Sequence, residues 1–291
     1  MFKGSLVAIV TPFRNGKIDE EALGRLIDWQ IAEGTHGIVP CGTTGESATL
    51  THAEHQRVIE FTIGAVNHRV PVVAGTGSNS TEEAVTLTRH AKQAGADGAL
   101  LITPYYNKPT QEGLYQHYRR IAEAVDLPIM LYNIPGRTSV NMLPSTVARL
   151  AQIPAIVSIK EGSGSIQQID EVLQLCGDRL SVLSGDDAMT LPIMALGGQG
   201  AVSVVANVAP RETAALITSA AKGDFAQART MHRRLLPLTN ALFLETNPIP
   251  VKTALALMGK CTDELRLPLC AMQPDTRQKL IDALKRHGLI S

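Results

Sequence analysis

Short apolar runs recur along the chain at regular intervals, and each run is followed by turn residues and a longer amphipathic stretch. The runs carry Val, Ile and Leu at successive rather than alternate positions, which is typical of parallel strands covered by helices. Pro40 lies inside the second run, where it removes a backbone donor, so that strand is expected to bulge or end early. Eight strands are predicted, near residues 5–10, 37–41, 71–75, 98–103, 128–133, 156–160, 180–184 and 200–205.

Capping signals indicate where several of the intervening helices begin and end. A side-chain oxygen followed three residues later by Glu or Gln is the spacing of a capping box. It occurs at Thr51 with Glu54, at Ser80 with Glu83 and at Ser165 with Gln168. A Gly-x-x-Gly pattern precedes the strands that begin at Gly37, Gly98 and Gly200. Glycine readily adopts the left-handed conformation that closes a helix, so these patterns predict helix ends.

Eight strand and helix units favour an α/β fold of the closed (β/α)8 type, for which about 250 residues is typical. An open doubly wound sheet is the alternative. The strand pattern stops after residue 223, and residues 224–242, 250–259 and 276–287 are predicted to form helices. We therefore predict a catalytic barrel over residues 1–223 and a C-terminal helical region over residues 224–291 that serves packing and assembly.

The composition narrows the choice of partners. The 291 residues include 27 basic and 27 acidic side chains, so the formal net charge is zero. Binding to nucleic acid or to an anionic membrane needs an excess of clustered Lys and Arg, and we expect neither. The N-terminus lacks the features of a signal peptide, and no long apolar stretch predicts a membrane helix, so the chain is expected to be cytoplasmic. Its four cysteines have no C-x-x-C spacing and are expected to be free thiols.

Polar residues follow several of the predicted strands, which is where a (β/α)8 barrel has its active site. Lys160 ends the apolar run 155–159, on the same face as Ile156 and Ser158. If that face points into the barrel, the loss of water lowers the pKa of the amine, and a neutral amine can form a Schiff base with a carbonyl. A salt bridge to Glu161 is the structural alternative.

Three other strand ends carry residues with two interpretations each. Tyr132 ends the preceding strand, where its phenol could transfer protons or simply fill the top of the barrel. Thr43 and Thr44 could shape a turn or hold a small carboxylate. Arg137 could cap a turn or bind a carboxylate through both of its terminal nitrogens. The residues alone do not decide between these interpretations.

Neither a metal nor a nucleotide is predicted. His52 and His55 lack a third nearby ligand of the kind that catalytic zinc sites have, and two solvated helix histidines are the simpler explanation. Asp186 and Asp187 could be metal ligands, but a helix N-cap is the simpler interpretation. The segment 75–77 matches neither a dinucleotide fingerprint nor a P-loop.

Four motifs occur in an order and spacing that carry a specific resemblance. They are Gly-Thr-Thr-Gly-Glu (42–46), Tyr-Tyr-Asn-Lys-Pro (105–109), Tyr-Asn-Ile-Pro-Gly-Arg-Thr (132–138) and Ile-Lys-Glu (159–161). Together they resemble the dihydrodipicolinate synthase branch of the class I pyruvate-dependent aldolases and lyases. The resemblance covers essentially the whole chain, including the segment 247–252 and the helical tail.

This resemblance implies a mechanism based on a covalent imine. Lys160 would form an imine with pyruvate, and loss of a methyl proton would convert the protonated imine into an enamine. The enamine would add to the aldehyde of L-aspartate 4-semialdehyde, and cyclisation would release the heterocycle, 4-hydroxy-tetrahydrodipicolinate, in the diaminopimelate route to L-lysine. The family requires neither a metal nor an organic cofactor. Tyr132 is the implied proton shuttle, linked through Thr43 to Tyr106.

The resemblance also implies how substrates and subunits are arranged. Thr44 would hold the pyruvate carboxylate, Arg137 would meet the carboxylate of the semialdehyde, and Gly185 and Val202 would line the pocket. Tyr106 would come from a neighbouring subunit, which implies a homo-oligomer, typically a tetramer built as a dimer of dimers. A second site, for L-lysine as a feedback inhibitor, would consist of Ser47, Ala48, Leu50, His52, His55, Asn79, Glu83 and Tyr105.

Two other functions stay open at this point. An N-acetylneuraminate lyase or a 2-keto-3-deoxy sugar acid aldolase shares the lysine and the tyrosine but cleaves a longer, hydroxylated substrate. Arg137 and the paired threonines favour the synthase, because the compact aldehyde has a carboxylate to bind. A non-catalytic barrel that binds a keto acid would keep the pocket without the chemistry, and the presence of Lys160 together with Tyr132 argues against it.

Overall fold

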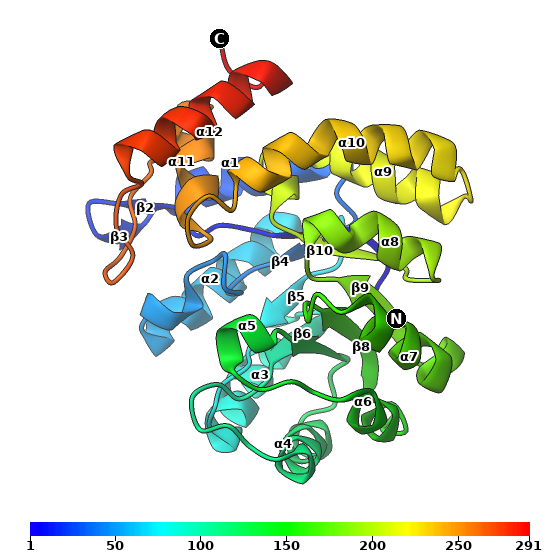
Figure 1. Cartoon of the computed structure of the whole chain (residues 1–291). Coiled ribbons are helices and arrows are strands. Elements are labelled where there is room, and N and C mark those ends of the chain that lie inside the picture. Colours follow the sequence, from blue (N-terminus) through cyan, green and yellow to red (C-terminus); the bar gives the residue numbers. More distant parts are fainter.

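Eight parallel strands form one sheet in the order β4-β1-β10-β9-β8-β7-β6-β5. A bridge between Ile38 and Val72 joins the two edge strands, so the sheet closes into a barrel, as predicted. The computed structural model describes all 291 residues, and Figure 1 shows the barrel with its surrounding helices. The strands are β1 Gly4–Ala8, β4 Gly37–Val39, β5 Val73–Gly75, β6 Gly98–Ile102, β7 Ile129–Asn133, β8 Ile156–Glu161, β9 Ser181–Ser184 and β10 Gly200–Ser203.

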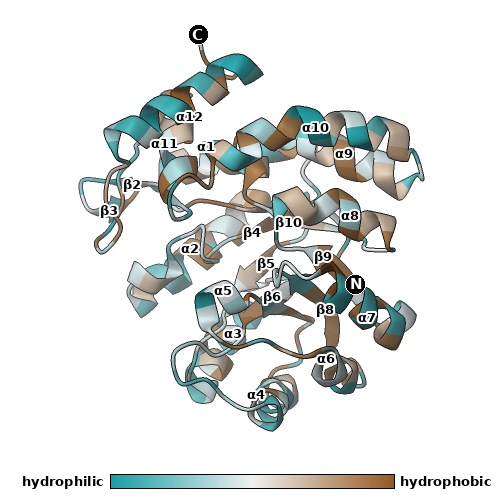
Figure 2. Cartoon of the chain, in the orientation of Figure 1, coloured by the Kyte–Doolittle hydropathy of each residue, from teal (hydrophilic) through white to brown (hydrophobic).

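All eight predicted strands are present, and β4 ends one residue before Pro40, as the missing backbone donor of proline predicts. Helices follow the strands and cover the outside of the barrel. Figure 2 shows hydrophobic and hydrophilic residues on different faces of the outer helices, so the apolar faces pack on the sheet. The helices are α1 Glu20–Ala32, α2 His52–Val66, α3 Thr81–Ala94, α4 Gln111–Ala124, α5 Pro135–Thr138, α6 Pro144–Leu150, α7 Ile166–Cys176, α8 Thr190–Ala195 and α9 Pro210–Ala221.

The predicted helix caps are confirmed in part. Thr51 and Glu54 form a complete capping box at the start of α2. Ser165 caps α7 by accepting a hydrogen bond from the backbone of Gln168. The capping box at Ser80 is wrong: α3 begins there, but the Ser80 side chain makes no capping bond. The Glu83 carboxylate binds the Ser78 hydroxyl and His52 instead.

A set of apolar side chains fills the interior of the barrel, separately from the packing between sheet and helices. The side chains inside the barrel form one hydrophobic cluster, and those between the sheet and the helices belong to other clusters, as expected when a sheet closes on itself. Tyr132 and Val202 belong to the interior cluster, and Tyr132 lies at the C-terminal end of its strand. The interior cluster contains Leu6, Ala8, Val39, Val73, Leu100, Met130, Tyr132, Leu183 and Val202.

The three helices predicted for the C-terminal region are present as α10 Phe225–Ala241, α11 Ile249–Leu257 and α12 Pro274–His287. Figure 1 shows α10 beside α9, with α12 crossing above α11. Barrel residues such as Val7 share one hydrophobic cluster with Leu255 and Leu284 of these helices. The division at residue 223 stays a prediction. No helix of this fold has both the length and the apolar composition that a membrane span requires.

Candidate active site

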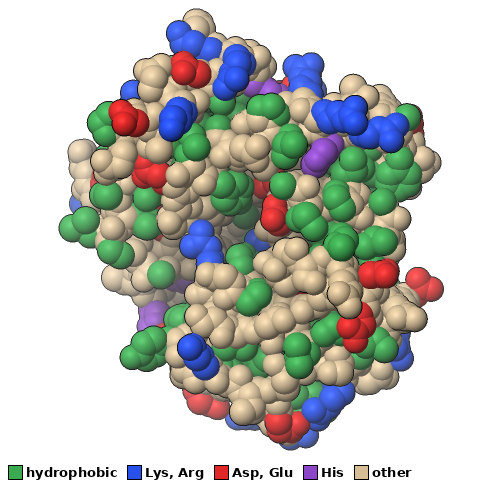
Figure 3. Space-filling model, viewed as in Figure 1, with side chains coloured by type: hydrophobic (Ala, Val, Ile, Leu, Met, Phe, Trp, Pro, Cys, Tyr) green, Lys and Arg blue, Asp and Glu red, His purple; other side chains and the backbone are tan.

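The register between β7 and β8 places Tyr132 beside Lys160 at the C-terminal end of the barrel. The Lys160 Nζ lies 4.1 Å from the centre of the Tyr132 ring. Both residues are buried, with 6% of Lys160 and 5% of Tyr132 exposed. Figure 3 shows a hollow near the centre of the visible face, with basic side chains at its edge. The predicted inward direction of Lys160 is therefore confirmed.

The environment of Lys160 makes its amine easier to deprotonate. The pKa of Lys160 is lowered from 10.5 to about 8, chiefly by burial; the carboxylate of Asp187 raises it and the charge on Arg137 lowers it. The alternative of a salt bridge to Glu161 is wrong. Glu161 accepts hydrogen bonds from Asn133 Nδ2, at 3.2 Å, and from the backbone of Ser163, at 2.7 Å. Lys160 therefore has no salt-bridge partner and can supply a neutral amine.

Tyr132 lines one small cavity together with Thr43, in the loop that follows β4. The pKa of Tyr132 is raised from 10 to about 12, chiefly by burial, while the charge on Arg137 and the neighbouring Thr43 side chain lower it. The structure thus brings Tyr132 beside Lys160 through the pairing of β7 with β8, and Thr43 reaches Tyr132 from the loop after β4. A phenol between a hydroxyl and an amine can pass a proton in either direction.

Thr44 and Arg137 are joined through a residue that the sequence prediction did not assign. Asn247 donates from its side-chain amide to Thr44 Oγ1 at 3.0 Å. Arg137, in α5, donates from Nη2 to the backbone carbonyl of Asn247, also at 3.0 Å. The segment that contains Asn247 was part of the resemblance, and this was the available signal for its place in the site.

Gly185 follows β9 directly beside the lysine. A Cβ atom at this position would lie 3.1 Å from Lys160 Cγ and 3.2 Å from Lys160 Cε. The backbone amide of Gly185 also donates to the carbonyl of Glu161 at 2.7 Å. Glycine is therefore the residue that leaves room for the lysine side chain. Val202 is buried in the same barrel interior as Tyr132.

Two adjacent acidic residues after β9 have different roles. Asp186 caps the short 3-10 helix 187–189 by accepting from Ala188 at 2.9 Å, as predicted. Asp187 is half-buried and accepts hydrogen bonds from the backbone of Val204, at 2.9 Å, and from the Ser203 side chain. Its negative charge raises the pKa of Lys160. The sequence prediction missed this influence because it depends on packing between β9 and β10.

Tyr106 is separate from these residues within one chain. It is 89% exposed and lies in a left-handed conformation with φ of 72°. It makes no hydrogen bond with Thr43 inside the chain, so the linkage that the resemblance implies is absent from a single subunit.

Residues predicted for the effector site line a cleft beside the active site. The cavity has a volume of about 430 Å³ and also contains Thr43 and Arg137. Seven of the eight predicted residues line it: Ser47, Ala48, Leu50, His52, His55, Glu83 and Tyr105. Asn79 lies outside the lining but donates to the Tyr105 carbonyl at 3.2 Å.

The two histidines of the cleft have different environments. His52 is exposed, and its Nε2 lies 2.7 Å from Glu83 Oε1. The prediction of a second solvated histidine is wrong, because His55 is buried and its pKa is lowered by desolvation to about 4. Cys41 is also buried, with its Sγ donating to the His55 carbonyl at 3.6 Å, and all four cysteines are free thiols.

Comparisons with known proteins agree on one family. A model of the dihydrodipicolinate synthetase family matches residues 1–287. The 4-hydroxy-tetrahydrodipicolinate synthase of Thermodesulfovibrio yellowstonii is 60% identical over 290 residues, with 100% of both chains covered. The chloride-inhibited dihydrodipicolinate synthase of Acinetobacter baumannii, solved in complex with pyruvate, is 48% identical with a TM-score of 0.98, and 100% of both chains is covered. The dihydrodipicolinate synthase of Cyanidioschyzon merolae, solved with lysine bound, is 41% identical with a TM-score of 0.97, and 99% of both chains is covered.

Proposed function

The chain belongs to the dihydrodipicolinate synthetase family, and from this premise we propose that it catalyses the 4-hydroxy-tetrahydrodipicolinate synthase reaction. It condenses pyruvate with L-aspartate 4-semialdehyde in the cytoplasm, in the diaminopimelate route to L-lysine. The observation that carries the proposal is the buried Lys160 amine, which is not paired with the adjacent Glu161 and lies 4.1 Å from the centre of the Tyr132 ring. A buried neutral amine beside a phenol suits Schiff-base chemistry on a small keto acid.

The first step uses the lowered pKa of Lys160. The neutral amine attacks the carbonyl carbon of pyruvate, and water leaves as the imine forms. The protonated imine then accepts the electron pair that the methyl group releases when it loses a proton. Because the imine itself is the electron sink, the reaction needs neither a metal nor an organic cofactor. The resulting enamine attacks the aldehyde carbon of the semialdehyde, and the substrate amine then displaces Lys160 as the ring closes.

Proton transfer in these steps is assigned to Tyr132 and Thr43. Tyr132 has its ring centre 4.1 Å from the amine, and the neighbouring Thr43 side chain partly offsets the rise in the pKa of Tyr132 that burial causes. Tyr106 of a neighbouring subunit completes the relay, which accounts for its exposure in the single chain. The active protein is therefore a homo-oligomer, proposed to be a tetramer built as a dimer of dimers.

The two substrate carboxylates have separate binding groups. The Thr44 hydroxyl is buried and oriented by the Asn247 amide, which suits it to the pyruvate carboxylate. The Arg137 guanidinium shares the rim of the cleft with Thr43, so it can meet the carboxylate of the incoming semialdehyde. Gly185 and Val202 shape the space around the imine. A compact substrate with a carboxylate fits this arrangement better than a long sugar acid does.

L-Lysine is proposed to bind in the adjacent cleft as a feedback inhibitor. Glu83 offers a carboxylate to an amino group, and His52 and Tyr105 add polar contacts along the wall. A lysine-bound relative that is 41% identical supports this use of the cleft. Because Thr43 borders both the cleft and Tyr132, an occupant of the cleft would lie next to the proton relay.

Borohydride trapping tests the proposed function directly. Incubation with pyruvate followed by reduction should add the mass of a reduced pyruvyl group to Lys160, and none to the buried Lys252. A Lys160→Met variant should show no adduct, while Lys92→Met, a substitution on the exposed surface of α3, should match the parent. Failure of the parent to form an adduct on Lys160 would refute the imine mechanism.

Two rate measurements then define the branch and the regulation. The parent should turn over pyruvate with aspartate semialdehyde and should not cleave sialic acid or keto-deoxy sugar acids, and the opposite preference would assign it to the sibling activity. L-Lysine should lower the initial rate, with potassium chloride of the same ionic strength as the control. An unchanged initial rate at saturating L-lysine would remove the effector assignment.

A further inference from the structure

The loop that carries Thr43 and Thr44 has an unfavourable backbone conformation at both ends. Cys41 has φ of 54° and Glu46 has φ of 55°, and neither residue is glycine. Side chains with a Cβ rarely adopt this left-handed region, and they stay there only when surrounding contacts hold them. Contacts outside the loop must therefore fix its conformation.

Glu46 is held by a lysine from the C-terminal region. Lys252, in α11, donates from Nζ to Glu46 Oε1 at 2.6 Å. Both side chains have 0% exposure, so this is a fully buried ion pair. The same Nζ donates to the carbonyl of Glu264 at 2.7 Å and lies 4.2 Å from the centre of the Phe13 ring. Burial lowers the pKa of Lys252, and the Glu46 carboxylate is the main group that offsets this effect.

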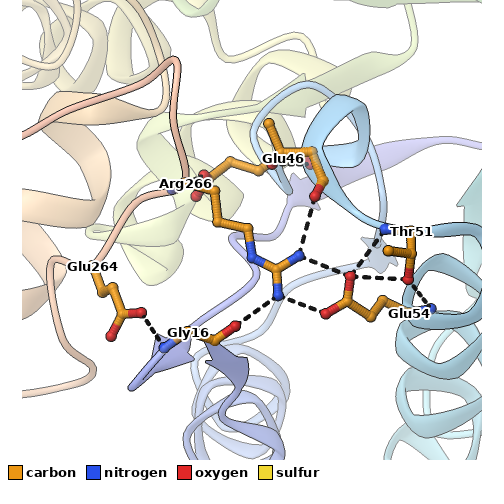
Figure 4. Close-up of polar contacts among 7 residues, drawn as sticks. Gly16, Glu46, Thr51, Glu54, Glu264 and Arg266 are labelled. Carbon is orange, nitrogen blue, oxygen red and sulfur yellow. Dashed lines mark hydrogen bonds and ion pairs between the residues drawn. The ribbon is translucent and has the colours of Figure 1, made fainter.

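Arg266 fixes the other carboxylate oxygen and the segment that follows the loop. Its backbone amide donates to Glu46 Oε2 at 3.2 Å. Its guanidinium donates to both Glu54 oxygens, at 2.5 and 2.8 Å, to the Thr49 carbonyl at 3.1 Å and to the Gly16 carbonyl at 2.9 Å. Figure 4 shows this guanidinium between Gly16 and Glu54, with Glu46 close by. Three segments of the chain thus meet at one arginine.

Two more hydrogen bonds hold the loop that carries Thr43 and Thr44. Asn247, which precedes α11, donates to Thr44 Oγ1 at 3.0 Å, and Thr11 Oγ1 donates to the Gly45 carbonyl at 2.7 Å. The loop is therefore attached on both sides of Gly45. A shift of Glu46 would be transmitted directly to the two preceding threonines, since only one residue separates Glu46 from Thr44.

We propose that the Lys252–Glu46 ion pair, supported by Arg266, positions Thr43 and Thr44 for the reaction with pyruvate. Lys252 and Glu46 are then positioning residues, and this role rests on the function proposed above. A buried charge tolerates only a narrow range of geometries, because displacement leaves it without a partner in a medium of low polarity. An ion pair at this place specifies the position of the loop more sharply than two apolar side chains would.

The test compares variants of the pair with a control that weakens the fold elsewhere. Lys252→Met and Glu46→Gln remove one charge each, and the double variant removes both. Tyr118→Phe is the matched control, because it deletes a buried hydrogen bond to the Leu101 carbonyl in the outer layer of the barrel. Each full-length variant is assayed for its melting temperature, for the KM and kcat with pyruvate, and for the rate of borohydride trapping at low pyruvate.

A positioning role predicts that the kinetic losses follow the ion pair rather than the stability. Lys252→Met should lower kcat/KM for pyruvate about tenfold or more, mostly through KM, because a displacement of about 1 Å is enough for such losses. Glu46→Gln should act in the same direction. The double variant should lose less than the product of the two single losses, since both substitutions break one contact. Tyr118→Phe should lower the melting temperature with the pyruvate KM unchanged.

Several outcomes would overturn the proposal. If all variants melt earlier while the pyruvate KM and the trapping rate stay within about twofold of the parent, the pair is only structural. Should Lys252→Met fail to fold, Glu46→Gln decides alone, and a folded Glu46→Gln protein with an unchanged pyruvate KM refutes the role. A parent that forms no imine on Lys160 would overturn the proposed function and this role together, whereas unaffected variants of an active parent overturn only the role.

Discussion

Titration of Lys160 should govern how imine formation depends on pH. Only the neutral amine attacks pyruvate, and burial lowers the pKa of Lys160 to about 8. At pH 7 about one-tenth of such an amine is neutral, compared with about one part in three thousand for an ordinary lysine. The environment of Lys160 therefore raises the reactive fraction about 300-fold. The trapping rate should rise about tenfold per pH unit and level off above the pKa of about 8.

The substitution Asp187→Asn tests the cause of this pKa. The Asp187 carboxylate favours the charged form of Lys160, so its removal should lower the pKa of Lys160 further. The plateau should then begin at a lower pH, and the trapping rate per site near neutral pH should rise. Asparagine keeps an acceptor for the Val204 amide, which Asp187 binds at 2.9 Å. Asp186→Asn is the control, because Asp186 caps a helix, a role that asparagine also fulfils.

The assay is borohydride trapping of the pyruvate imine from about pH 6 to about pH 10, alongside kcat/KM for pyruvate, which reports groups of the free enzyme. Far-ultraviolet circular dichroism at each pH confirms that the variants stay folded. A parent profile that still climbs at the upper end would mean that Lys160 has the pKa of an ordinary lysine. A shift of the Asp187→Asn profile to higher pH would refute the electrostatic reasoning.

Three further predictions concern the groups around this lysine and the capping of α2. Arg137→Ala should raise the KM for the semialdehyde about tenfold or more through the loss of a charge-assisted contact. Trapping of the pyruvate imine should still be observed. An unchanged KM for the semialdehyde would remove Arg137 from the site. Gly185→Ala should slow pyruvate trapping, because the new Cβ lies 3.1 Å from Lys160 Cγ, whereas Gly64→Ala, with no atom within 4 Å, should match the parent; equal trapping in both variants would contradict the crowding argument. Hydrogen bonds from Arg266 and, to a smaller extent, from Thr51 lower the pKa of Glu54 from 4.5 to about 2, against the effect of burial. Ionised Glu54 therefore stabilises the fold above pH 4.5 and loses this effect as the pH falls through 2. Glu54→Gln should therefore lower the urea midpoint at neutral pH more than at the acid limit, and equal losses at both would show that the charge is irrelevant.

The strands of the barrel could be predicted from the sequence because their signal is local. Each strand is covered on both sides, so its apolar run is continuous, and the proline that ends β4 marks its own position. Closure of the sheet was a weaker inference, since it depends on Ile38 meeting Val72 across the edge. The capping box at Ser80 failed for a related reason, because Glu83 found partners outside its own helix.

The convergence of the candidate site residues was predictable for a different reason. Strand ends meet at one rim of a barrel, so the positions of Lys160, Tyr132 and Thr43 along the sequence already implied that they converge. Which of the charged neighbours would act on the lysine was not predictable. Glu161 is adjacent in sequence but binds Asn133, whereas Asp187 acts from the end of another strand. Distances between side chains decide such effects, and these follow only from packing.

The C-terminal region shows where prediction from sequence reaches its physical limit. Its helices were recognised from their amphipathic pattern, which carries no information about which loop they contact. A barrel sheet fixes where each strand ends but leaves the following loop many conformations, because the loop is outside the ladder of backbone hydrogen bonds. Cys41 and Glu46, at the two ends of the loop with Thr43 and Thr44, have left-handed backbone conformations. Contacts with other segments of the chain must therefore hold this loop in place. Asn247 and Lys252 supply them from more than 200 residues further along the chain. The C-terminal region, although it lies outside the barrel, therefore contacts the loop of the candidate active site directly.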